Sequence, residues 1–247
     1  MGIARYQIFM VIKSIILSSF LLICTLLMKA QSPETGKLND IDGNVYHTVV
    51  IGNYEWMAEN LRTTTYNNGT KIPNITENTT WVGLSSGAYC WYNNNDSNAV
   101  TTGALYNWYA VNTGILCPNG WRVPTDEEWK FLEGTVDTRY GVGDQVWDDP
   151  KSRGYDVAKQ LMATSGWRSG GNGPDHFGFF ALPGGERLIN GRFFIMGSNG
   201  FWWSSTGADT LSAWYRSIIY CFEDIIRFRH DKRFGFSVRC LRDKRVK

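Results

Sequence analysis

The residues that could carry nucleophilic or acid–base chemistry are few and scattered. Histidine occurs three times, at His47, His176 and His230, and none of them lies in a nucleophile motif. Ser204 and Ser205 are adjacent, but the Gly-x-Ser-x-Gly turn that presents a hydrolase serine is absent. Because such an enzyme needs a nucleophile within reach of a base, the sequence predicts that this protein is not an enzyme.

Three segments could offer oxygen atoms to a cation. Asp144, Asp148 and Asp149 lie close together, residues 40–44 read DIDGN, and residues 93–96 read NNND. Calcium takes six to eight oxygen ligands, and an EF-hand loop has its glycine at position 6 and a glutamate at position 12. Segment 40–44 has its glycine at position 4 and no closing glutamate, so it is better interpreted as a turn. Segment 93–96 is the better candidate for calcium, and nothing in the sequence indicates another cofactor.

Aromatic and polar side chains that suit sugar or peptide binding recur in short runs. Trp and Tyr rings stack on sugars, and Asn or Arg side chains hold hydroxyl groups, which is the mixed lining of a binding pocket. The candidate ligand-binding residues are Trp91, Tyr92, Asn94, Trp202, Trp203, Tyr215 and Arg216. The alternative is that these rings build the core. Since side chains alternate along a strand, only one of Trp214 and Tyr215 is expected to face outward.

The N-terminal segment predicts export. Arg5 and Lys13 precede an apolar run over residues 14–28, and polar sequence follows. A charged start, a short apolar run and a small residue at the exit are typical of a secretory signal peptide, here residues 1–30. The run is shorter than the roughly 20 apolar residues of a membrane-spanning helix. We therefore expect a secreted or cell-envelope protein with no membrane span after signal removal.

Removal of this signal changes the charge of the chain. Arg5, Lys13 and Lys29 are lost with no acidic residue, so the formal charge falls from +2 to −1. No basic surface remains to suggest a nucleic-acid partner. Cys24 lies within the signal and follows Ile23, whereas a lipoprotein signal needs a small residue there, so lipidation is disfavoured.

Four cysteines remain after processing. They are Cys90, Cys117, Cys221 and Cys240. An even number in an exported chain predicts disulfides, but four cysteines permit three pairings and the sequence does not choose among them.

The elements that must position these residues are mixed in type. Helices are expected at residues 104–111, 125–134 and 155–164. Strands are expected at residues 45–51, 55–61, 213–222, 224–229 and 236–241, with turns at Asn190-Gly191 and Asn199-Gly200. Thr125 and Glu128 form a capping box at the start of the second helix, and Gly134 is expected to end it. Helices in the middle and strands at the end indicate an α+β fold, with one domain over residues 38–243, a flexible lead-in at 31–37, and long ordered loops over 65–103.

Ten short strings, in this order, resemble one known family. They are DIDGNVY at 40–46, WMAENL at 56–61, YCWYNN at 89–94, GALYNWYA at 103–110, CPNGWRVP at 117–124, EW at 128–129, ALPGG at 181–185, WWSST at 202–206, AWYR at 213–216 and GFSVRC at 235–240. Together they resemble the Fibrobacter succinogenes major paralogous domain family over roughly residues 38–243.

The resemblance implies an exported protein with no established activity. Parts of it are also similar to C-type lectin-like folds and to the formylglycine-generating enzyme group, which implies a twisted antiparallel sheet with two to three helices. In that architecture the implied disulfide is Cys117–Cys240, which leaves Cys90 and Cys221 as a possible second pair. The enzyme group holds copper with two close cysteines. Here Cys221 and Cys240 are nineteen residues apart, and the lectin triplets that present calcium to sugars are absent.

The sequence therefore predicts an exported, non-catalytic surface binding module of C-type lectin-like architecture. Its expected partner is a glycan or a surface protein. The alternative is a structural or assembly subunit of the cell envelope or of a surface appendage. The sequence does not determine the oligomeric state.

Overall fold

Two four-stranded antiparallel sheets contain most of the strands in the computed structural model, which describes residues 35–168 and 170–244. The first sheet has the order β1-β2-β3-β12. Its strands are β1 (Thr35–Asn39), β2 (Val45–Ile51), β3 (Tyr54–Met57) and β12 (Leu241–Asp243). The sheet thus joins the start of the described chain to its end.

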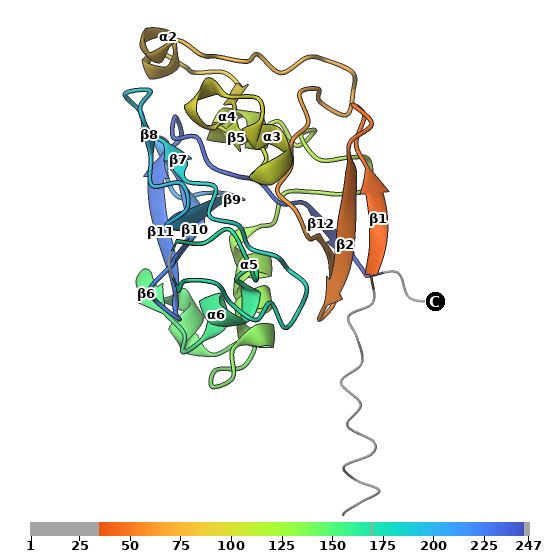
Figure 1. The fold of residues 1–247 in the computed structure, drawn as a ribbon, viewed down its shortest axis with the longest axis vertical. Helices are drawn as coiled ribbons and strands as arrows, with labels where there is room; N and C mark the ends of the chain where they lie inside the picture. Colours follow the sequence, from red (N-terminus) through yellow and green to blue (C-terminus); the bar gives the residue numbers. More distant parts are fainter. Residues whose placement is uncertain (1–34, 169, 245–247) are drawn as a thin grey trace, which may run out of the picture. The chain divides into compact units, whose positions relative to one another are not determined.

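The second sheet has the order β6-β11-β10-β9. Its strands are β6 (Lys151–Arg153), β9 (Asn199–Gly207), β10 (Ser212–Ile219) and β11 (Ile225–Asp231). Two small ribbons complete the strands described: β4 (Tyr89–Cys90) with β5 (Leu105–Tyr106), and β7 (Glu186–Arg187) with β8 (Phe193–Phe194). The β7–β8 hairpin lies next to β9, β10 and β11 (Figure 1) and is joined to their region by the bridge from Arg187 to Gly235.

The described residues contain five α-helices and two 3-10 turns. The helices are α2 (Asn78–Val82), α3 (Asn98–Thr101), α4 (Trp108–Val111), α5 (Asp126–Val136) and α6 (Val157–Leu161), and the turns are η1 (Tyr92–Asn94) and η2 (Gln145–Asp148). None of the helices in the described part of the chain is long and apolar enough to cross a membrane.

Helices α5 and α6 lie between the two large sheets (Figure 1). One buried cluster joins Trp56 and Leu241 of the first sheet, Trp129 of α5, and Trp202 and Ile218 of the second sheet. A second cluster includes the rings of Tyr106, Phe201, Trp203, Tyr215 and Phe236, and a third, smaller one surrounds Trp81 and Cys90. Large rings thus fill the space between irregular connections.

The fold confirms the α+β prediction and corrects several local ones. Helix α5 has the predicted capping box, but Gly134 lies inside it. A Cβ at Gly134 would come within 2.7 Å of Val142, so this glycine permits a close approach of two chain segments. Strand β5 occupies the first part of the helix predicted over residues 104–111, and α4 occupies the last part. Asn199 begins β9 and is not in a turn, whereas Asn190-Gly191 does turn the β7–β8 hairpin.

The N-terminal predictions have different outcomes. Residues 35–37, in the predicted flexible lead-in, belong to β1 and pair with β2. The predicted signal peptide over residues 1–30, with Cys24, lies outside the described residues.

The implied disulfide is confirmed, because Cys117 and Cys240 are bonded with their Cα atoms 6.0 Å apart. Cys90 and Cys221 are both free, with Cys90 buried and Cys221 exposed, so the second predicted pair is wrong.

Candidate functional site

Four of the seven candidate ligand-binding residues are buried in the core. Trp202 donates its Nε1–H to Asn60 Oδ1 at 2.8 Å, and Trp203 donates its own to the carbonyl oxygen of Tyr106 at 2.9 Å. Tyr215 and Arg216 are buried as well. These four side chains do not reach the surface, so their predicted ligand contact is not retained.

Of the neighbours Trp214 and Tyr215 on β10, Tyr215 was chosen as a ligand-binding residue, but Trp214 is the one that faces outward. The half-exposed side chain is Trp214, whose ring lies 3.6 Å from the guanidinium carbon of Arg227. Tyr215 faces the aromatic core on the other side of the sheet.

Arg216 is part of a buried ion network under α5. Its Nη1 lies 2.7 Å from Asp126 Oδ1, and its Nε contacts Glu133. Arg227 also pairs with Asp126 at 2.7 Å, and Arg153 pairs with Glu133. Burial opposes ionisation of Asp126, but hydrogen bonds from Arg227 and the charge of Arg216 outweigh it and lower its pKa to about 2. The network anchors α5 to the sheet and leaves no side chain for a ligand.

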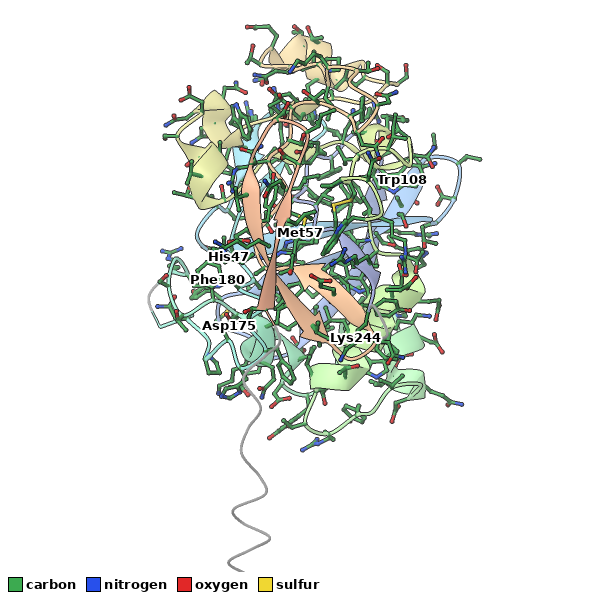
Figure 2. The ribbon with its side chains drawn as sticks, turned by 90° about the vertical axis from the view of Figure 1, so that its right-hand side faces the viewer. His47, Met57, Trp108, Asp175, Phe180 and Lys244 are labelled. Atoms are coloured by element: carbon green, nitrogen blue, oxygen red, sulfur yellow. A yellow bond between two sulfur atoms is a disulfide. The ribbon has the colours of Figure 1, made fainter. Side chains whose placement is uncertain are left out.

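Arg239 is also buried, and its guanidinium is satisfied by neutral oxygens. It donates to Asn60 Oδ1 at 3.0 Å, to the carbonyl oxygen of Met57 at 3.2 Å and to that of Phe180 at 2.6 Å. Asp175 and Phe180 lie on the same side of the molecule (Figure 2), and Asp175 Oδ1 accepts the Phe180 N–H at 2.9 Å. Burial lowers the pKa of Arg239 to about 9. This arginine therefore shapes the loop before β7.

The other three candidates lie together between β4 and α3. The ring of Tyr92 packs on Phe193 with centroids 5.3 Å apart, and its hydroxyl accepts the N–H of Met196 at 3.4 Å. Asn94 Nδ2 donates to the carbonyl oxygen of Thr76 at 3.1 Å. Trp91 is half-exposed and packs edge-on against Tyr89, at 5.2 Å.

These contacts place Tyr92 beside two exposed apolar side chains of the β7–β8 region, and Asn94 is linked to the same region through the Thr76 carbonyl, which Arg187 also contacts. Phe194 is 54% exposed and Met196 is 38% exposed. We call Tyr92, Asn94, Phe194 and Met196 the hairpin surface. Sequence reasoning missed Phe194 and Met196. The Asn190-Gly191 turn marked the hairpin but not which of its side chains remain in solvent.

Backbone strain concentrates at this surface. Asn93, Asn94 and Ile195 all have φ of 54°. Asparagine tolerates this left-handed region, but for a β-branched residue such as isoleucine it is a true outlier. Strained residues persist only where the surroundings hold them, and they are enriched at binding sites. The carbonyl oxygen of Ile195 accepts the N–H groups of Ser198 and Asn199, which closes the turn.

Arg187 supports the hairpin surface from below. Its fully buried guanidinium donates to the carbonyl oxygens of Gly191 at 3.0 Å and Thr76 at 2.9 Å, and lies 4.2 Å from the Trp81 ring. The same Thr76 carbonyl holds Asn94. One buried side chain thus ties the hairpin to the segment before α2, and the surface is preorganised.

The DIDGN segment is a turn, as predicted. Asp40 accepts hydrogen bonds from the backbone N–H groups of Asp42 and Asn44 and from the Tyr46 hydroxyl. For Asp42, burial opposes ionisation, but hydrogen bonds from Thr65 and Thr64 outweigh it and lower the pKa to about 2. A hollow of about 270 Å³ lies beside this turn, lined in part by Asp40, Thr65 and Cys117. The Asp40 carboxylate is occupied by groups of the turn and Tyr46, and the Asp42 carboxylate by Thr63, Thr64 and Thr65.

The remaining chemical candidates are dispersed. His47, exposed on β2 (Figure 2), contacts Glu59 at 2.6 Å, His176 contacts Gln160 at 2.6 Å, and His230 stacks between aromatic rings. Burial raises the pKa of the Cys90 thiol to about 12. Over residues 35–168 and 170–244, no group of three or more His, Cys, Asp or Glu side chains is arranged to hold a metal ion.

Comparison with known proteins yields one match. A family model described as the Fibrobacter succinogenes major domain matches residues 49–242. No curated protein and no solved structure matches the chain.

Proposed function

The chain belongs to the Fibrobacter succinogenes major domain family, and we propose that it is a non-catalytic surface binding module that recognises a glycan or a surface protein through the hairpin surface. The observation that carries the proposal is the exposure of Phe194 and Met196 beside Tyr92, above a buried arginine that makes the loops rigid. Exposed rings on a preorganised framework bind with little loss of entropy.

A secreted or cell-envelope location is part of this proposal. The bond between Cys117 and Cys240 supports it, because disulfides persist in oxidising compartments. We further propose a C-type lectin-like architecture. Its support is the long-range disulfide next to the last strand, together with helices packed against antiparallel sheets.

A glycan array and a cell-binding assay, each with and without calcium, test the proposed function. The informative pair of variants is Phe194→Ala and Phe222→Ala, since both rings are 54% exposed but Phe222 lies in the turn after β10, outside the hairpin surface. We expect Phe194→Ala to weaken binding at least about tenfold, which corresponds to about 1.4 kcal/mol. Phe222→Ala should bind like the wild type.

The two assays separate the two partner classes. Selective array binding that Phe194→Ala abolishes supports a glycan ligand. A blank array with Phe194-dependent binding to cells supports a surface protein. Equal behaviour of the two variants in both assays would show that the hairpin surface is not the binding site.

A further inference from the structure

The carboxylate of Glu186, beside the hairpin surface, has no hydrogen-bond or ion-pair partner among the residues that the structure describes. Glu186 is only 7% exposed. Buried polar groups are normally paired, so an unpaired carboxylate at this place calls for an explanation.

Strand register places Glu186 beside an exposed ring. Glu186 pairs with Phe194 across the hairpin, so their side chains share a face, whereas Arg187 and Phe193 share the opposite face. Phe194 is 54% exposed, so this face of the hairpin reaches solvent beside the carboxylate.

No cationic side chain within residues 35–168 or 170–244 pairs with Glu186. Arg187, the adjacent residue, points to the other face and is occupied by Gly191, Thr76 and the Trp81 ring. Burying an ionised carboxylate without a partner costs several kcal/mol. A partner from outside the described chain would remove this cost.

We infer that Glu186 receives an ammonium group of the ligand, with the ring of Phe194 beside it. Aromatic faces attract cations, and a carboxylate beside them favours an organic ammonium. A divalent metal is disfavoured because calcium needs six to eight oxygen ligands, and within the described residues Glu186 belongs to no group of three or more His, Cys, Asp or Glu side chains that could hold a metal ion. This inference rests on the proposed function and narrows its ligand to one that bears a protonated amine, from an amino sugar or a lysine side chain.

The test is an NMR titration of the protein at pH 7.5 with two matched pairs of small probes. Glucosamine is compared with N-acetylglucosamine, and Nα-acetyl-lysine amide with its Nε-acetylated form. We expect the amines to perturb signals of residues around Glu186 and their uncharged counterparts to do so at least about tenfold more weakly. A response to only one of the two amines identifies the source of the ammonium group.

Two variants complete the test. Glu186→Gln keeps the shape and removes the charge, and it should lose the amine response. Glu77→Gln removes an exposed carboxylate at the start of α2 and should retain it. Equal responses to amine and acetylated probe, or a full response in Glu186→Gln, would overturn the inference. If binding in the array or cell assay depends on Phe194 but not on Glu186, the inference fails while the proposed function stands.

Discussion

Replacing Glu186 with glutamine should remove a pH dependence of folding that this carboxyl group creates. Burial raises the pKa of Glu186 from 4.5 to about 7. Below pH 4.5 the group is protonated in both the folded and the unfolded chain. Between pH 4.5 and 7 the unfolded chain loses this proton while the folded chain keeps it, so the free energy of unfolding falls as the pH rises. Above pH 7 the group is ionised in both chains, and it no longer changes the free energy of unfolding with pH.

The size of the effect follows from the difference between the two pKa values. Each pKa unit corresponds to 1.36 kcal/mol, so the shift is equivalent to about 3 kcal/mol, and residual solvent contact reduces it toward about 2 kcal/mol. Glutamine resembles the protonated acid and does not titrate. We therefore expect equal stability of wild type and Glu186→Gln near pH 4.5, and a variant more stable by about 2–3 kcal/mol at pH 8.

Urea unfolding of both proteins at pH 4.5, 6 and 8 measures this difference. Subtracting the wild-type value from the variant value at each pH cancels the other titrating groups. One of them is His230, whose pKa burial lowers and which would make stability rise with pH. A variant with the same gain at every pH, or with none at pH 8, would refute the claim that Glu186 is desolvated and unpaired.

Three further substitutions test the framework. Cys117→Ser opens a covalent loop that spans 123 positions, and the chain-entropy expression gives a loss of about 5 kcal/mol in the free energy of unfolding. The thermal melt of this variant should match that of reduced wild type. A melt like that of oxidised wild type would contradict the expectation. Glu133→Gln leaves Arg216 without one of its buried partners and should lower the free energy of unfolding by about 3–5 kcal/mol, whereas a loss below about 1 kcal/mol would mean that the network relaxes. Gly134→Ala should destabilise helix α5 despite the higher helix propensity of alanine, because its Cβ would lie 2.7 Å from Val142; unchanged hydrogen exchange in α5 would disprove the close approach.

Local signals in the sequence predicted local structure well. The Thr125–Glu128 capping box marks the start of α5, strand β2 has the predicted ends, and Asn190-Gly191 turns the hairpin. Each of these signals acts through residues that are neighbours in the chain. Gly134 shows where local signals fail. A glycine late in a helix normally ends the helix, but this one stays inside α5, where the segment at Val142 leaves no room for a side chain.

The candidate site was predicted only in part because residue type does not determine exposure. Trp91, Tyr92 and Asn94 lie at the hairpin surface or next to it in the chain, but Trp202, Trp203 and Tyr215 have similar chemistry and are buried. Nor does the sequence show that Glu133 has two partners whereas Glu186 has none in the described part of the chain.

The sequence by itself determined the family, the α+β class, the capping box and, through the family resemblance, the Cys117–Cys240 bond. The tertiary structure alone decided which aromatic rings face water, which carboxylates are paired and that Cys90 and Cys221 remain apart. The physical reason is distance along the chain. A capping box joins positions three residues apart, whereas the ring of Trp202 is held by Asn60, 142 positions away.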